Sequence, residues 1–154
     1  MTKPRVLFIC TGNASRSQLA KALADQIGKG AILSESAGAF PGRQINPGTI
    51  AYMRERGVDV ANEKPKGFWD VGDEFDRVVT LCDAAYQYCL ELRTSRPPDF
   101  LPPCLSAIPE RHEHWSIPDP GMDLRAHWDT ARLIEPRVKN LIARLTAVEV
   151  AVGE

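Results

Sequence analysis

The residues best suited to chemistry lie in one short stretch near the N-terminus. Four apolar residues lead into Cys10, five residues follow it, and Arg16 then opens a pattern of apolar residues at helical spacing. This order predicts a buried strand, a tight loop and the N-terminus of a helix, and such a loop directs backbone N–H groups at a common centre. The loop is therefore predicted to bind an anion. Arg16 would hold this anion by two parallel hydrogen bonds, and Cys10 would lie beneath it as a thiolate.

The residues between Cys10 and the helix support an anion-binding loop. Gly12 permits a backbone conformation that other residues resist, and Asn13 can stabilise a left-handed turn. Ser17 is expected to donate its hydroxyl proton to the Cys10 sulfur. The predicted oxyanion-binding residues are Thr11, Gly12, Asn13, Ala14, Ser15, Arg16 and Ser17. The alternative interpretation is a buried cysteine at a strand end before an ordinary helix.

Three side chains further along the chain also suit chemistry. Cys82 and Cys89 are thiols seven positions apart, and Asp119 stands between Pro118 and Pro120, which restrict its backbone. An aspartate in this position is a candidate general acid that protonates a leaving oxygen. The alternatives are a buried strand-end thiol for Cys82, a core or surface cysteine for Cys89 and a turn residue for Asp119.

The strands that must position these residues are predicted from short apolar segments, which cover residues 5–9, 31–37, 77–81 and 114–117. Strands that alternate with helices form a parallel sheet, and its strands all end at one edge, where ligands bind. Cys10, Cys82 and Asp119 each follow a predicted strand directly. They are therefore expected to emerge at the same edge.

Apolar residues at helical spacing predict the intervening helices. One follows Arg16 and ends near Gly28, and a second begins at Asn46-Pro47 with an N-cap and a proline at the first helical position. A third is expected over 83–93. The last helix closes the chain, and Pro136 is predicted to start or kink it.

Longer motifs around these residues point to a known family. The segment Cys10-Thr11-Gly12-Asn13-x-x-Arg16-Ser17-Gln18 resembles the phosphate loop shared by low-molecular-weight protein tyrosine phosphatases and the arsenate reductases built on the same fold. Residues 78–82 and 114–120 resemble two further segments of the arsenate reductase branch. The resemblance covers roughly residues 5–83 and 114 to the last helix. It implies an α/β fold, a three-layer sandwich with a four-stranded parallel sheet.

Single residues favour the reductase branch. The phosphatases usually place proline after Arg-Ser, where this chain has Gln18, and usually follow the acidic Asp-Pro with tyrosines, where it has Gly121 and Met122. The reductases need extra thiols, which Cys82 and Cys89 supply.

The resemblance implies the reduction of arsenate to arsenite. Cys10 would form an arsenic–sulfur adduct, Cys82 would attack Cys10 and release arsenite, and Cys89 would attack Cys82 to regenerate Cys10. Residues seven apart on a helix are separated by about 10.5 Å along its axis, whereas a disulfide needs Cα atoms within about 7 Å. The segment 83–89 is therefore expected to loop out or partly unwind on oxidation.

The expected partners are a small oxyanion, arsenate or phosphate, and a thioredoxin-like dithiol that reduces the final disulfide. The alternative function is hydrolysis of phosphomonoesters by a low-molecular-weight protein tyrosine phosphatase. That reaction would pass through a phosphocysteine intermediate and use only Cys10, Arg16 and Asp119. A non-catalytic oxyanion-binding module is a third interpretation, and Asp119 argues against it, since binding alone needs no acid.

No metal or other cofactor is expected. His112 and His114 alternate on a short strand, but neither they nor His127 lie in a ligand pattern with cysteine or carboxylate. Some relatives of the resembled family bind potassium through an asparagine, a glutamate and a serine. Asn13 and Ser36 match that pattern, but Lys21 stands at the glutamate position. Cys104 matches no motif, and its role is left open between a bystander and a fourth redox thiol.

Composition sets the broader limits. The chain has 154 residues, a formal net charge of -1 and 44% hydrophobic residues, which suits one globular domain over residues 1–154 without affinity for nucleic acid or membrane. No apolar run is long enough to span a bilayer, so a cytoplasmic location with reduced cysteines is expected. A proline-rich insertion at about 94–110 is predicted to be an irregular surface segment.

Overall fold

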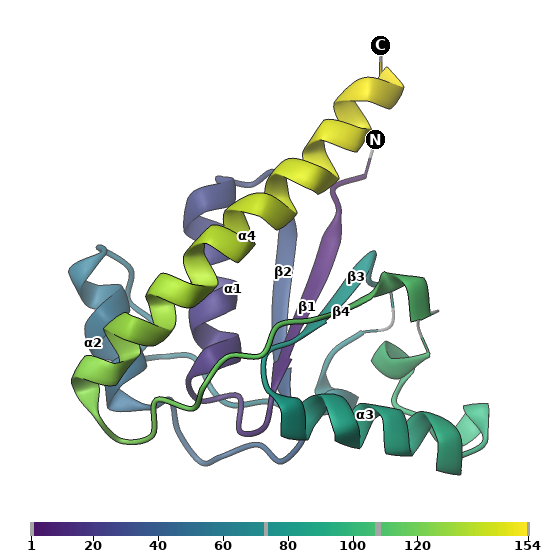
Figure 1. Ribbon diagram of the computed structural model, residues 1–154, viewed down its shortest axis with the longest axis horizontal. Coiled ribbons are helices and arrows are strands. Elements are labelled where there is room, and N and C mark those ends of the chain that lie inside the picture. The colour runs from purple at the N-terminus through teal and green to yellow at the C-terminus, as the bar shows by residue number, and fades with distance from the viewer. Residues whose placement is uncertain (1, 73, 107–108, 154) are drawn as a thin grey trace.

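The predicted parallel sheet is present and lies at the centre of the molecule. The computed structural model describes residues 2–72, 74–106 and 109–153, and within them four parallel strands lie in the order β2-β1-β3-β4 (Figure 1). The strands are β1 (Arg5–Cys10), β2 (Leu33–Gly38), β3 (Arg77–Thr80) and β4 (His112–His114). β1 is an inner strand because β2 and β3 flank it, and its residues Val6–Ile9 are fully buried.

The last strand is displaced from its predicted position. It covers His112–His114 and not residues 114–117. Its pairing with the neighbouring segment continues in part, since Trp115 N donates to Thr80 O at 2.7 Å and Ile117 N donates to Leu81 O at 3.1 Å. Pro118 has no N–H to continue the ladder, so Asp119 leaves the sheet edge in irregular structure.

Within the described residues, four helices flank the sheet: α1 (Arg16–Gly28), α2 (Pro47–Glu55), α3 (Asp83–Ser95) and α4 (Leu124–Gly153). The helices α1 and α4 pack against each other on one face of the sheet, and α3 lies on the other (Figure 1). This arrangement is the three-layer α/β sandwich that the sequence resemblance implied.

The last helix begins earlier than its proline suggests. It starts at Leu124, so Pro136 lies inside it and does not start it. The signal for its start is Asp123, whose carboxylate accepts from the Arg125 N–H at 2.9 Å. An aspartate ahead of a helix satisfies a backbone donor that has no partner within the helix.

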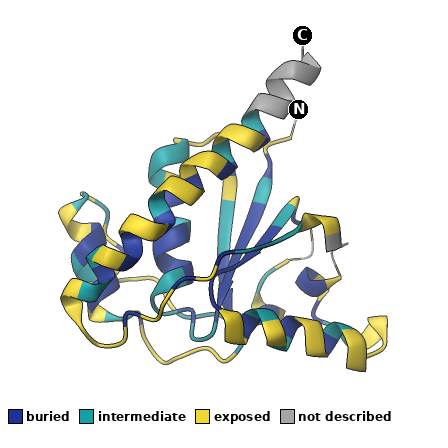
Figure 2. Ribbon diagram, in the orientation of Figure 1, coloured by how far each residue is buried: buried dark blue, intermediate teal, exposed yellow. Residues whose placement is uncertain are grey.

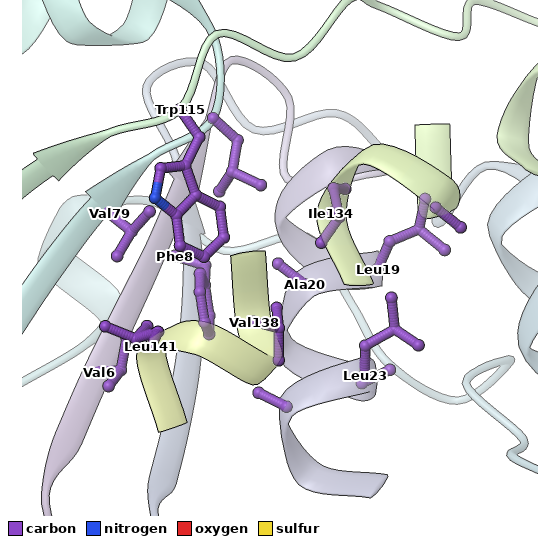
Figure 3. Packing of buried hydrophobic residues seen from close by; sticks show 14 of the residues in the cluster. Val6, Phe8, Leu19, Ala20, Leu23, Val79, Trp115, Ile134, Val138 and Leu141 are labelled. Atoms are coloured by element: carbon purple, nitrogen blue, oxygen red, sulfur yellow. The ribbon is translucent and has the colours of Figure 1, made fainter. Parts of the chain in front are cut away.

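Side chains of β1 alternate between two separate hydrophobic clusters. Val6 and Phe8 belong to the larger cluster, where they pack with Trp115 and with residues of α1 and α4 (Figure 3). Leu7 and Ile9 belong to the second cluster, which lies beneath α3. Figure 2 shows β1 and β3 mainly buried between these helical layers, with exposed residues on the outer helix faces.

The proline-rich segment differs from the predicted surface loop. It contains short 3₁₀ turns at Pro98–Phe100 and Pro103–Leu105, because proline at a first helical position favours a turn. Cys104 and Leu105 are each 1% exposed and belong to the second cluster. The segment therefore contributes to the core under α3.

Across the described parts of the chain, no helix combines the length and apolar character that a membrane crossing requires.

Candidate active site

The loop after β1 has the predicted form, with one correction. Cys10 ends β1, Arg16 opens α1, and Asn13 adopts the left-handed conformation with φ 52°. Gly12 is not at a positive φ, and a Cβ added to it would meet nothing within 4 Å. The expectation that Gly12 supplies the special backbone geometry was therefore wrong, and Asn13 supplies it.

The Cys10 sulfur accepts two hydrogen bonds. The backbone N–H of Asn13 donates to Sγ at 3.2 Å, and the Ser17 hydroxyl lies 2.9 Å from Sγ. Because the Asn13 side-chain amide donates to Ser17 Oγ at 2.7 Å, the hydroxyl proton of Ser17 is free to point at the sulfur. Both donors stabilise a thiolate at Cys10.

A second segment supports the loop from outside, and no local sequence pattern predicts this contact. The N–H groups of Ala39, Phe40 and Gly42 donate to the carbonyls of Cys10, Thr11 and Gly12 at 2.8–3.0 Å. A Cβ at Gly38 would lie 2.8 Å from Asn13 N and from Thr11 O. Only glycine therefore allows this segment to approach the loop so closely.

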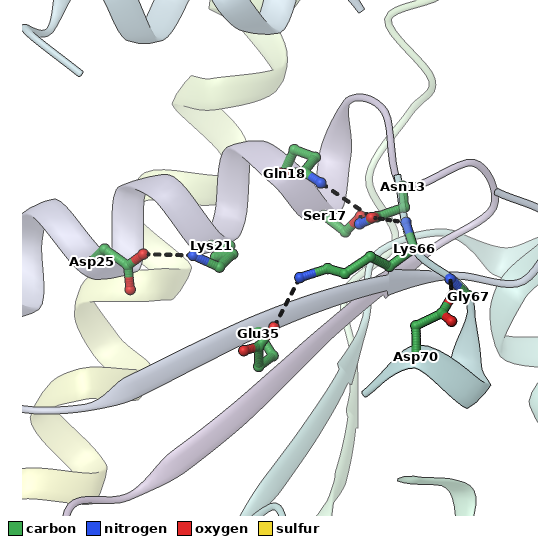
Figure 4. Close-up of polar contacts among 9 residues, drawn as sticks. All are labelled: Asn13, Ser17, Gln18, Lys21, Asp25, Glu35, Lys66, Gly67 and Asp70. Carbon is green, nitrogen blue, oxygen red and sulfur yellow. Dashed lines mark hydrogen bonds and ion pairs between the residues drawn. The ribbon is translucent and has the colours of Figure 1, made fainter. Parts of the chain in front are cut away.

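Buried polar side chains hold the loop from its inner side. Asn13 is fully buried, and its Oδ1 accepts from Gln18 Nε2 at 3.1 Å and from the Lys66 N–H at 2.8 Å (Figure 4). His127 of α4 is also fully buried, and its Nε2 lies 3.2 Å from Ser15 Oγ. Among the supporting residues outside the loop, the sequence offered a signal only for Gln18, which stands in the loop motif, and none for Lys66 or His127.

Two of the three residues expected to meet at the sheet edge, Cys82 and Asp119, line a common pocket, whereas Cys10 is buried at the end of β1 and does not line it. Thr11, Arg16, Cys82 and Asp119 line one open pocket, and the Thr11 hydroxyl lies 3.2 Å from Cys82 Sγ. Arg16 Nη1 donates to Ile117 O at 2.9 Å, which ties the arginine to the segment that leads to Asp119. The Asp119 side chain is exposed and accepts from the Gly121 N–H at 2.9 Å. The pocket thus unites residues from three strand ends.

The helix α3 carries the remaining predicted thiol. Cys82 is its N-cap residue and Cys89 lies two turns further along, so both thiols lie on the buried face of an intact helix. All four cysteines are free. Burial raises the pKa of Cys89 to about 11, with the Arg93 guanidinium acting against this shift. Cys89 is therefore a protonated thiol at neutral pH.

A chain of hydrogen bonds links α3 to β4. Arg93 can only donate, so its Nη1 donates to His112 Nδ1 at 2.7 Å, and His112 Nε2 must carry the proton that points to Thr80 Oγ1 at 3.1 Å. Thr80 Oγ1 lies 2.7 Å from His114 Nδ1, and His114 Nε2 lies 2.7 Å from Asp83 Oδ1. Bonds from His114 and from the Ser116 hydroxyl lower the pKa of Asp83.

Acidification is expected to destabilise the protein in part through His112. Burial lowers the pKa of His112 from 6.5 to about 4, and the neighbouring charges of Arg93 and His114 act in the same direction. The folded state therefore binds fewer protons than the unfolded state in this range, so His112 contributes stability above pH 6.5 that is lost as the pH falls through about 4.

Urea unfolding at a series of pH values measures this effect in the wild type and in His112→Gln. A glutamine can still accept from Arg93 and donate to Thr80 but cannot bind a proton. The variant should therefore lose less stability between pH 6.5 and 4 than the wild type. Equal losses in the two proteins would show that His112 does not titrate as inferred.

The described residues contain no group of three histidine, cysteine or carboxylate side chains placed to hold a metal ion. At the positions that match the potassium pattern, Asn13 Oδ1 already accepts two N–H donors and Lys21 Nζ pairs with Asp25 at 3.0 Å (Figure 4). Ser36 retains a buried hydroxyl without a partner among the described residues. An ammonium group and a saturated amide oxygen do not fit a monovalent cation.

Comparisons with known proteins agree with this geometry. A family model described as low molecular weight phosphotyrosine protein phosphatase matches residues 5–150. The glutaredoxin arsenate reductase of Synechocystis sp. is 29% identical over 144 residues, which cover 92% of this chain and 98% of the relative. The arsenate reductase of Staphylococcus aureus strain Newman is 34% identical over 126 residues, which cover 79% and 82% of the two chains.

Solved structures show the same fold. An arsenate reductase in the phosphate binding state has a TM-score of 0.71 and 28% identity, and the match covers 92% of this chain and 98% of the other. A low molecular weight protein tyrosine phosphatase from T. tengcongensis has a TM-score of 0.72 at 20% identity, covering 93% and 100% of the two chains. The second likeness concerns the fold alone.

Proposed function

Because this chain belongs to the low molecular weight phosphotyrosine protein phosphatase family, we propose that its Cys10 loop captures a tetrahedral oxyanion, and that this oxyanion is arsenate, which the protein reduces to arsenite. The observation that carries the reduction is the second thiol at the pocket, Cys82, whose Sγ lies 3.2 Å from the hydroxyl of Thr11. Ester hydrolysis needs no such thiol. The relatives at 29% and 34% identity are named arsenate reductases, which supports the same reaction.

Capture begins with the Cys10 thiolate. The thiolate attacks arsenic(V), an S–As bond forms, and one arsenate oxygen leaves as water after it takes a proton from Asp119. Arg16 and the N–H groups of residues 11–17 bind the remaining oxygens, and their donors favour the charge that develops on them. This step changes no oxidation state.

Reduction follows when Cys82 loses its proton and attacks Cys10 Sγ. An S–S bond forms between the two cysteines, and the S–As bond breaks with its electron pair moving to arsenic, so arsenic(V) becomes arsenic(III) and arsenite leaves. Cys82 is only 4% exposed, yet it lines the pocket beside the loop.

Cys89 then attacks Cys82, which frees the Cys10 thiolate for another cycle. Cys82 and Cys89 are too far apart to bond along an intact α3, so the first two turns of the helix must open. Asp83 is the residue that such an opening must release from His114 and Ser116. A thioredoxin-like dithiol is proposed as the reductant, because a disulfide within one chain is reduced by a partner that supplies two thiols.

Stoichiometric arsenate added to the fully reduced protein tests this proposal. The chain has four cysteines. One arsenite should form per protein, and two of the four thiols should disappear, as counted with a thiol reagent after unfolding. In Cys89→Ser the relay should stop one step earlier, and disulfide mapping should find Cys10 joined to Cys82.

The phosphatase alternative predicts a different outcome from the same samples. If an aryl phosphate is hydrolysed while all four thiols persist in the presence of arsenate, the protein is a phosphatase and not a reductase. Loss of two thiols without arsenite would indicate ordinary oxidation and would also contradict the proposal.

A further inference from the structure

We infer that Cys104 is a fourth redox thiol, which attacks Cys89 in the Cys82–Cys89 disulfide and moves the oxidised bond to a Cys89–Cys104 pair. This inference rests on the proposed function, since it adds one exchange to the end of the proposed relay. Arg93 is assigned as the positioning residue for this exchange.

The first support is the position of the thiols. All four cysteines of the chain belong to the hydrophobic cluster under α3. Cys89 is 0% exposed and Cys104 is 1% exposed, although they come from a helix and from a proline-rich turn. The Cys104 thiol makes one hydrogen bond, to Phe68 O at 3.5 Å, which leaves its sulfur without a charged partner in that bond.

The second support is Arg93, which fixes the two segments together. It lies one helical turn after Cys89, and its Nε donates to the carbonyl of Leu105, the residue after Cys104, at 2.9 Å. Its Nη1 donates to His112. Its Nη2 is buried and has no hydrogen-bond partner among the described residues. A guanidinium so placed leaves one donor available for a thiolate.

Charge effects agree with this placement. Burial raises the pKa of Cys104 to about 12, and the nearby Cys89 sulfur adds to the shift, whereas Arg93 acts against it. Arg93 acts against the raised pKa of Cys89 in the same way. One half-buried cation therefore acts on both thiols.

The exchange is balanced and needs no added oxidant. Cys104 loses its proton and attacks Cys89 Sγ, the Cys89–Cys104 bond forms, and the Cys82–Cys89 bond breaks with its electron pair on Cys82 Sγ. Cys82 takes up one proton, so the net change is a thiol–disulfide exchange. The exchange is favourable because Cys89–Cys104 joins two packed segments and allows α3 to close, whereas Cys82–Cys89 requires the helix to stay open.

The test is a map of the thiols that remain after one turnover. The reduced wild-type protein is mixed with stoichiometric arsenate without a reductant, quenched in acid, unfolded and alkylated, and the alkylated cysteines are identified by mass spectrometry. The inference predicts that Cys10 and Cys82 carry the alkyl group in most molecules. In Cys104→Ser, only Cys10 should carry the alkyl group, because Cys82 and Cys89 stay joined by a disulfide.

The result that overturns the inference is equally specific. If arsenite forms but the labelled pair in the wild type is Cys10 and Cys104, the proposed function stands and Cys104 takes no part. If no arsenite forms, the proposed function itself fails. The two failures are thus distinguished within one sample.

A second variant tests Arg93 without removing a thiol. In Arg93→Gln the Cys89–Cys104 bond should form about tenfold more slowly, the effect of losing about 1.4 kcal/mol of thiolate stabilisation, and the rate should recover as the pH rises toward the thiol pKa. Arg93→Lys should restore part of the rate at neutral pH. A defect in Arg93→Gln that is independent of pH would mean that Arg93 only supports the fold.

Discussion

Replacing Cys10 with serine is expected to abolish arsenite formation. A serine hydroxyl at this position cannot form the S–As bond that carries the electron pair to arsenic, so the rate should fall by at least about 10⁴-fold, the scale seen when a nucleophile is removed. Single-turnover arsenite release, measured with excess protein over arsenate, checks this. The serine can still accept the N–H of Asn13, so the loop should keep its form.

The matched control is Cys89→Ser, which removes a buried thiol of the same cluster but leaves the capture and reduction steps intact. It should release close to one arsenite in the first turnover. Thermal unfolding of both variants shows whether either has lost its fold. Arsenite release by Cys10→Ser within tenfold of the wild type would remove Cys10 from the mechanism.

Replacing Arg16 with lysine is expected to lower kcat/KM for arsenate by about 10²–10³-fold. Lysine keeps the positive charge but loses the planar fork that binds two oxyanion oxygens at once. It also loses the geometry in which one nitrogen donates to Ile117 O and another faces the pocket. Initial rates over a range of arsenate concentrations, with a reductant in excess, measure the change.

Arg43→Lys provides the matched control for this substitution. Arg43 is exposed on the segment that runs beside the loop, and it does not line the pocket with Arg16. Its replacement should leave kcat/KM within about twofold, as expected of a surface charge in water. Similar losses in both variants would mean that the effect does not depend on the position of Arg16 in the pocket, which would contradict the role given to its planar fork.

The positions of Cys10, Cys82 and Asp119 were predictable because parallel topology is a strong constraint. Once strands alternate with helices, every strand end must reach the same edge, whatever the length of the connections. The prediction did not depend on exact boundaries: Cys10 ends β1, and Cys82 and Asp119 line one pocket although β4 ends at His114 and not at residue 117. The phosphate-loop motif then predicted which of these residues would act on an oxyanion.

Other features of the site depend on contacts between distant segments and leave no local pattern. The close approach of Gly38 to the loop and the contact of His127 with Ser15 are examples. The burial of Cys104 is another, since prolines around a cysteine predict a turn but do not indicate which way its side chain points. Such contacts are set by tertiary packing.

Because the thiols of the proposed relay are also core residues, the proposed redox cycle and the folding equilibrium share the same side chains. Each disulfide formed within the cluster changes how tightly its neighbours pack. By linkage, a difference in folding free energy between the dithiol and disulfide forms appears as a shift of the reduction potential, about 30 mV for 1.4 kcal/mol. Substitutions of purely apolar cluster members such as Phe75 and Leu92 should therefore shift the reduction potential of the cluster's thiols, although neither residue lines the pocket.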